Sequence, residues 1–155
     1  MLYQTTEFDT ENQFDWTSIQ YTIENDVVIA TRTTFDAGYE VFGTYEDGVL
    51  RQEFYVGTLE ALGFDNQRIV YDADGVMTER GTVYPDSLRV TESFQNGIPT
   101  ETVIKDGFFG DGEKPWDQIV LRYDAEGNII GRTITYDDGP QTVEAFAPGH
   151  FKTVQ

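Results

Sequence analysis

An internal repeat of about fifty residues constrains this chain more than any other feature. Three aromatic residues are each followed sixteen positions later by an arginine, and the aromatic residues lie 48 and 52 positions apart. The aromatic residues are Trp16, Phe64 and Trp116, and the arginines are Arg32, Arg80 and Arg132. We place the copies at about residues 14–56, 62–106 and 114–149. A period of this length indicates supersecondary units that bury their apolar residues against their neighbours.

Short β-strands account for the segments between these anchors. Asp-Gly and Asn-Gly pairs, which favour two-residue hairpin turns, recur at intervals of about ten residues. The intervening segments are rich in β-branched and aromatic residues and cover 27–35, 39–45, 49–56, 76–84, 88–94 and 129–136. The pattern predicts an all-β antiparallel meander, either an open twisted sheet or barrel-like. Residues 57–62 suit a helical turn or two, while the first ten residues and those after Pro148 lie outside the pattern.

Length and charge limit the classes of protein that fit. A chain of 155 residues predicts a single domain spanning residues 1–155. Its hydrophobic content of 39% is too high for a disordered acidic chain. The 28 acidic residues against 10 basic ones give a net charge of −18, which disfavours direct binding to nucleic acid or to anionic membranes. Such a charge favours cations or a basic protein partner.

Few features of the sequence indicate a compartment. The chain has no cysteine, so disulfide bonds and thiolate chemistry are excluded. Its first residues lack the basic and apolar regions of a cleavable signal peptide. No apolar run reaches the roughly 18 residues that a membrane span needs. The compartment stays open, and we favour a secreted, surface or virion setting over the cytoplasm.

The third copy carries the most recognisable motif. Trp116 to Gly139 reads Trp-x-x-Ile-x-x-x-Tyr-Asp-Ala-x-Gly-x-x-x-x-Arg-x-x-x-Tyr-Asp-Asp-Gly, in which the Tyr-Asp-Ala segment begins at Tyr123 and matches a second one at Tyr71. This pattern resembles the YD-type repeats of large secreted or surface bacterial proteins and, more distantly, RHS and MORN-variant repeats. The resemblance covers about residues 14–147. It implies a structural or adhesive repeat with no catalytic residues, whereas three copies are too few for the closed shell of RHS arrays.

Acidic residues are concentrated at the turns and in one glycine-rich loop. Calcium accepts carboxylates at such places, and the best candidate ligands are Asp106, Asp111 and Glu113, although they lack the EF-hand spacing. The acidic residues at the turns are Asp72, Asp74, Asp124, Glu126, Asp137 and Asp138. Asp at a turn more commonly bonds its own backbone, and we prefer that interpretation for these six. Calcium is the only cofactor that we leave open.

The repeated arginines and tryptophans fit structural roles better than chemical ones. An arginine in step with the period is expected to pair with a neighbouring acid or to stack on an aromatic ring. Trp16 and Trp116 are expected to pack within each repeat rather than to form a sugar-binding platform. His150, the only histidine, has no nucleophile motif to serve. A glycosidase needs two carboxylates, but nothing in the sequence selects a pair, so we expect no enzymatic activity.

The sequence therefore predicts a non-enzymatic structural or adhesive interaction module of a secreted, surface or virion assembly. Its partner would be another protein or a second copy of the chain, engaged through the sheet edges. One alternative is an acidic inhibitor, such as a nucleic-acid mimic, immunity or anti-defence protein, that binds a basic partner. Another is a binding module stabilised by calcium.

Overall fold

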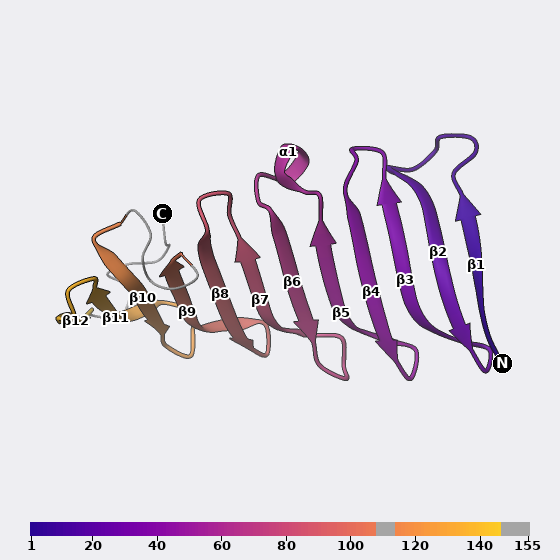
Figure 1. The fold of residues 1–155 in the computed structure, drawn as a ribbon. Helices are drawn as coiled ribbons and strands as arrows, with labels where there is room; N and C mark the ends of the chain where they lie inside the picture. The colour runs from indigo at the N-terminus through magenta and orange to yellow at the C-terminus, as the bar shows by residue number, and fades with distance from the viewer. Residues whose placement is uncertain (108–113, 147–155) are drawn as a thin grey trace. The chain divides into compact units, whose positions relative to one another are not determined.

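The computed structural model describes residues 1–107 and 114–146. Within them the chain forms twelve β-strands and one four-residue helix, and neighbouring strands pair antiparallel within each unit, so the predicted all-β meander is confirmed (Figure 1). The chain divides into two compact units, Met1–Met77 and Thr78–Gln155. We describe each unit by itself. The single domain over residues 1–155 stays a prediction.

The first unit contains six strands and the helix. They are β1 Leu2–Phe8, β2 Trp16–Glu24, β3 Val27–Phe35, β4 Glu40–Glu46, β5 Val49–Val56, α1 Leu59–Leu62 and β6 Asn66–Tyr71. Each strand pairs with the next one along the chain. Asn25 and Asp26, with φ of 52° and 65°, connect β2 to β3 in the left-handed conformation that a tight hairpin turn demands.

The second unit has the same plan. Its strands are β7 Met77–Val83, β8 Leu88–Gln95, β9 Ile98–Asp106, β10 Trp116–Tyr123, β11 Ile129–Tyr136 and β12 Gln141–Ala145. They too pair in chain order, where the structure describes them. In neither unit do the described first and last strands pair with each other, so each sheet is open and the barrel alternative is wrong.

Six of the twelve described strands lie where the turn pattern places them. β3, β5 and β11 have the predicted bounds, and α1 falls within the predicted segment 57–62 and ends at Gly63 with φ of 83°. The first residues do not lie outside the sheet. Residues 2–8 form β1 and pair with β2 in one unbroken register, because they alternate in the same way as the other strands. The segment after Pro148 lies outside the described residues.

Each unit is a single layer. All described strands of a unit belong to one sheet, and α1 is the only other element, so no second layer of the same unit covers either face. Only four hydrophobic side chains are buried among the described residues: Val41, Ile69, Leu121 and Ile129. Stability therefore depends on backbone ladders and on contacts between side chains of neighbouring strands on the same face.

Candidate interaction surfaces

One face of the first unit is rich in tyrosine. Strand alternation and the pairing registers place five tyrosines from five strands on this face, which we call the tyrosine face. They are Tyr3, Tyr21, Tyr45, Tyr55 and Tyr71. Tyrosine supplies a large, rigid contact area with a polar end, and it is enriched where proteins bind one another. This face is therefore the leading candidate for an interaction surface.

Two glutamates on the tyrosine face hold tyrosine hydroxyls in place. The Tyr21 hydroxyl donates to Glu7 Oε1 at 3.0 Å, and the Tyr71 hydroxyl donates to Glu53 Oε1 at 2.6 Å. Burial and these hydrogen bonds raise the pKa of Tyr21, and they raise the pKa of Tyr71 far above its usual range. Burial, followed by the charge of Glu53, also raises the pKa of Tyr55. The two hydrogen bonds therefore orient the hydroxyls of Tyr21 and Tyr71.

The opposite face of the first unit, which we call the polar face, carries polar and charged side chains together with exposed apolar ones such as Phe42 and Phe54. A shallow hollow on it is lined by Thr6, Ser18, Gln20, Arg32 and Thr34. Arg32 Nε donates to Glu40 Oε2 at 2.6 Å, and this hydrogen bond raises the pKa of Arg32 and lowers that of Glu40. The guanidinium also lies 5.6 Å from the centre of the Phe42 ring. The Arg32 guanidinium therefore contacts two side chains of the neighbouring strand.

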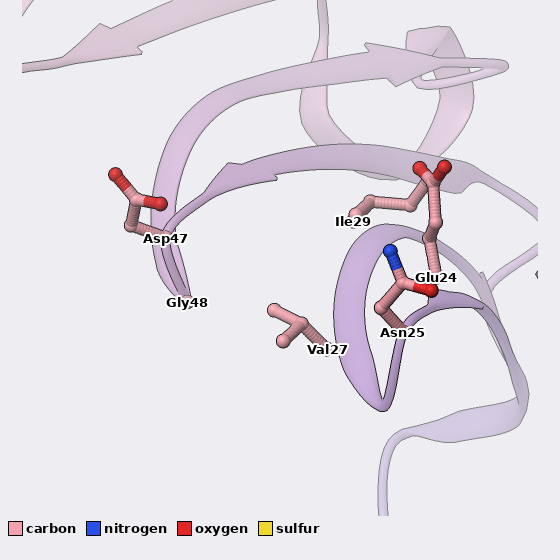
Figure 2. Close-up of a pocket in the computed structure, with 6 residues that line it drawn as sticks. All are labelled: Glu24, Asn25, Val27, Ile29, Asp47 and Gly48. Carbon is pink, nitrogen blue, oxygen red and sulfur yellow. The ribbon is translucent and has the colours of Figure 1, made fainter. Parts of the chain in front are cut away.

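A second hollow lies between two hairpin turns of the first unit. Glu24, Asn25, Val27 and Ile29 line it from the β2–β3 hairpin, and Asp47 and Gly48 line it from the β4–β5 turn. Figure 2 shows the carboxylates of Glu24 and Asp47 on separate turns, and they do not point toward one another. The hollow is open to solvent on a broad side, and its geometry does not assemble a nucleophile with a base.

Two of the repeated arginines occupy matching positions. Arg80 contacts both carboxylate oxygens of Glu92, at 2.8 and 3.0 Å, and lies 5.8 Å from the centre of the Phe94 ring. Fifty-two positions later, Arg132 contacts both oxygens of Glu144, at 2.7 and 2.9 Å, and lies 5.9 Å from the Phe146 ring. The hydrogen bond to Glu92 raises the pKa of Arg80. Each arginine joins two strands through an ion pair and an aromatic contact.

Arg32 does not occupy the corresponding position, although its spacing from the aromatic anchor is the same. Arg80 and Arg132 stand directly opposite a glutamate on the next strand, whereas Arg32 stands opposite Phe42. Each arginine precedes the first residue of the β-turn that follows its strand. Arg32 precedes Phe35 by three positions, whereas Arg80 and Arg132 precede residues 84 and 136 by four. A shift of one residue moves a side chain to the other face of its strand. The residue that corresponds to Arg80 is therefore Thr31.

The two tryptophans begin their strands in the same way. Trp16 pairs with Phe35 and Trp116 pairs with Tyr136, and a β-bulge follows each tryptophan. The carbonyl before each tryptophan accepts a backbone hydrogen bond, at 2.9 and 3.1 Å, from the residue after its partner. The Trp16 ring stacks on Phe14, with centroids 5.2 Å apart. Their matching positions agree with a repeat, but the number of copies stays a prediction.

The remaining anchors are held by hydrogen bonds. The Phe64 carbonyl accepts from Thr58 Oγ1 at 2.5 Å, and Thr58 is fully buried. The Tyr123 hydroxyl shares a hydrogen bond of 2.8 Å with Thr102 Oγ1. Both contacts tie a repeat anchor to the strand or helix beside it.

Two of the six acidic residues at the turns, Asp72 and Asp124, bond their own backbone. Asp72 Oδ1 accepts from the backbone N–H groups of Asp74 and Val76, and Asp124 Oδ1 accepts from those of Glu126 and Asn128, all at 2.9–3.0 Å. These bonds, that from Asn128 foremost, lower the pKa of Asp124. This geometry is that of turn-initiating aspartates.

The predicted calcium ligands fall at the edge of the described chain. Asp106 ends β9, is 3% exposed and accepts a hydrogen bond of 2.8 Å from the Lys114 backbone N–H at Oδ2. Asp111, Glu113 and His150 lie outside the described residues. Within residues 1–107 and 114–146, no three acidic or histidine side chains form a group able to hold a metal ion. Calcium binding by Asp106, Asp111 and Glu113 stays a prediction.

A carboxyl pair in the second unit replaces a hydroxyl contact of the first. In the first unit, Thr17 Oγ1 donates to Asp36 Oδ1 at 2.7 Å. The matching residues of the second unit are Asp117 and Asp137, which hydrogen-bond each other. This bond, together with burial and the charges of Asp117 and Asp106, raises the pKa of Asp137 to about 6. Asp117 Oδ1 is buried and has no hydrogen-bond partner in the described part of the chain.

The outermost strands expose their free edges. All seven residues of β1 are exposed, and four of the five residues of β12 are. Unprotected edges are templates for another strand, and natural sheets block them with lysine, proline or bulges. β1 has none of these features: its sequence is LYQTTEF and its register with β2 is unbroken. This edge is the second candidate interaction surface.

Negative charge is unevenly divided between the units. Residues 1–77 contain 15 acidic residues against 3 basic ones, whereas residues 78–155 contain 13 against 7. The first unit therefore carries net charge −12 of the total −18.

No protein-family model and no curated protein matches this chain. Among the described residues, no helix is long and apolar enough to cross a membrane.

The tyrosine face was not identified in the sequence analysis, although part of its signal is present there. Tyr21 and Tyr45 each continue an alternating run of apolar or small residues, as in Ile19-x-Tyr21 and Val41-x-Gly43-x-Tyr45. That pattern assigns a residue to one side of its own strand. Only the registers between strands show which sides form a common face. Bulges at two of the pairings also change which residues of a strand lie on that face.

Proposed function

We propose that this chain is a non-enzymatic interaction module of a larger protein assembly, and that the tyrosine face of its first unit is the binding surface. The observation that carries the proposal is the gathering of five tyrosines on one face of a single-layer unit. An aromatic face that no other layer of its own unit covers is a surface that another protein can bury. The resemblance to YD-type repeats supports a secreted or surface setting.

The fixed orientation of two tyrosine hydroxyls supports a binding role for this face. Tyr21 and Tyr71 are already oriented by Glu7 and Glu53, so a partner that packs on these rings meets side chains with little rotamer freedom left to lose.

Two neighbouring residues of β5 provide a matched test. Tyr55 lies on the tyrosine face, while Phe54 is 37% exposed on the polar face. The wild-type chain and the variants Tyr55→Thr and Phe54→Thr are immobilised, and a partner retained from an extract of the source is purified and titrated against all three. We expect Tyr55→Thr to weaken binding by roughly tenfold or more and Phe54→Thr to leave it within about twofold. Equal affinities for the two variants would remove the tyrosine face from the proposal.

A second candidate function is an acidic inhibitor of a basic protein. The observation that favours it is the balance of 15 acidic residues against 3 basic ones in residues 1–77. Binding steered by charge weakens steeply as salt screens it. A titration against a basic nuclease at 0.05 and 0.5 M NaCl tests this candidate. An inhibitor loses most of its affinity at the higher salt, and a chain that never binds the nuclease is not one of this class.

A further inference from the structure

We infer that the free edge of β1 pairs with the β1 strand of a second copy, giving a twofold dimer with one continuous sheet across the contact. This inference rests on the proposed interaction role and names one partner for it. The strand is seven residues long, entirely exposed and unprotected by a bulge, proline or basic residue. Such an edge accepts another strand through its open backbone groups.

The backbone alternation of β1 identifies these open groups. The Met1 carbonyl accepts from the Asn25 N–H, and the Asp9 N–H donates to the Thr17 carbonyl, both at 3.0 Å. Odd-numbered residues therefore direct their N–H and C=O groups toward β2. The even-numbered residues direct theirs away from the sheet, and they are Leu2, Gln4, Thr6 and Phe8.

Only one antiparallel register uses all of these groups. Pairing Leu2 with Phe8 and Gln4 with Thr6 of the second copy engages the four open N–H and four open C=O groups of each strand. The twofold axis then passes through Thr5. A slip of two residues in either direction leaves Leu2 or Phe8 unpaired.

The side chains are self-complementary in that register. On the polar face, Leu2 and Phe8, each 64% exposed, meet across the contact and cover one another. On the tyrosine face, Tyr3 stands opposite Glu7 of the second copy, and Thr5 stands opposite its own counterpart. Glu7 is the only charged side chain in β1, so no like charges are directly opposed. The two tyrosine faces become one surface, because directly opposed residues point to the same side of a sheet.

The same reasoning does not favour β12 as the strand that pairs with the β1 edge. The Phe146 N–H donates to the Ile130 carbonyl at 2.8 Å, so even-numbered residues of β12 face β11. The open positions are then residues 141, 143 and 145, one fewer than in β1. A β1–β12 contact therefore leaves part of the β1 edge unpaired.

Cysteine cross-linking tests the register directly, because the chain has no cysteine of its own. Where two directly opposed residues of antiparallel strands do not hydrogen-bond each other, their Cα atoms lie about 4.5 Å apart, a distance that a disulfide can span. Thr5→Cys should form a covalent dimer under mild oxidation, far faster than Gln4→Cys, which faces Thr6. Val143→Cys is the matched control at the β12 edge. Cross-linking of Val143→Cys in preference to Thr5→Cys would overturn the inference.

Sedimentation equilibrium with proline variants gives a second, independent test. Thr6→Pro removes an outward N–H and leaves the β1–β2 ladder intact, so the dimer dissociation constant should rise roughly tenfold or more. Val143→Pro, which removes an outward N–H from β12, should leave it within about twofold. Because the copies repel through their net charge, the wild-type dimer should tighten from 0.05 to 0.5 M NaCl.

The outcomes separate this inference from the proposed function. A wild-type chain that stays monomeric at roughly millimolar concentration, or a dimer that Thr6→Pro leaves unchanged, refutes β1 self-pairing. Binding of another protein that depends on Tyr55 would survive either result. Conversely, a β1 dimer that binds no partner through Tyr55 would support the self-pairing and remove the tyrosine face from the proposed function.

Discussion

Asp117 and Thr17 show how one residue changes the chemistry of a repeated contact. Both follow a tryptophan at the start of a strand, and both face an aspartate that follows the tryptophan's partner. Threonine donates a hydroxyl to that aspartate, but aspartate can bond it only by holding a proton between two carboxyl groups. The raised pKa of Asp137, about 6, is the result.

This pair makes stability dependent on pH. The folded chain holds a proton between pH 4 and 6 that the unfolded chain releases, because the pKa of Asp137 is raised to about 6 from its ordinary value of 3.8. The pair therefore adds stability at low pH and loses it as pH rises through 6. We expect Asp117→Thr to raise the melting temperature at pH 8 relative to wild type, with the gain shrinking toward pH 4.5. Calorimetry across that range checks it, and a gain independent of pH would contradict this explanation.

The reciprocal change provides the control. Thr17→Asp builds the same carboxyl pair in the first unit, beside Asp36. It should lower the melting temperature at pH 8 and lower it less at pH 4.5. If Thr17→Asp has the same effect at both pH values, the carboxyl pair is not the cause.

The arginine–glutamate pairs differ in geometry and should differ in strength. Arg80 contacts both oxygens of Glu92, whereas Arg32 contacts one oxygen of Glu40 and its side chain is 52% exposed. A double-mutant cycle on Arg80 and Glu92 should give a coupling of about 0.5–1 kcal/mol that falls as salt is added. The same cycle on Arg32 and Glu40 should give less. Urea unfolding measures both, and equal couplings would show that the second contact adds nothing.

At the scale of the elements, turn chemistry allowed six of the twelve described strands to be predicted. Asp-Gly and Asn-Gly pairs bound β-branched segments so closely that β3, β5 and β11 were placed at their observed ends. β1 was not predicted because it precedes the first tryptophan anchor, so the repeat gave no reason to include it. The position of Arg32 differs from that of Arg80 for a related reason. The two-residue turn at Asn25 shortens one hairpin, so the same spacing from Trp16 does not place Arg32 opposite a glutamate.

One substitution in the β2–β3 turn should increase the stability of the chain. Asp26 adopts φ of 65°, a conformation that costs a non-glycine residue roughly 1 kcal/mol. The β8–β9 turn solves the same problem with Asn96 followed by Gly97. Asp26→Gly should therefore stabilise the chain by about 0.5–1 kcal/mol in urea unfolding. Asn96→Ala, which forces alanine to adopt a φ near 53°, should destabilise it; a destabilising Asp26→Gly would refute the turn assignment.

At the scale of the whole molecule, the sequence predicted an antiparallel meander but did not decide closure. Closure depends on cumulative twist and register across many strands, and bulges such as that after Trp16 alter both. The tyrosine face was not predicted for the same reason, since it arises from pairing between strands rather than from patterns within them.

The net charge of −18 should weaken the fold through self-repulsion. Raising NaCl from 0.02 to 0.5 M screens this repulsion, so the melting temperature should rise by a few degrees. The effect should be similar with KCl, because screening does not depend on the cation. A rise seen only with millimolar calcium would instead indicate a specific site and would support the calcium prediction at Asp106, Asp111 and Glu113.

Solvent access to the tyrosine rings shows whether the tyrosine face is open to a partner. Paramagnetic relaxation by a soluble gadolinium chelate, measured by NMR in dilute solution, reports which ring protons meet solvent. Because Tyr3 is 42% exposed and Tyr45 and Tyr55 are half-buried, we predict clear enhancement at all three rings, at Tyr3 to an extent similar to Phe54, which is 37% exposed on the polar face. Strong enhancement at Phe54 with none at the tyrosines would mean that another layer covers them, which would contradict the account of an open interaction surface.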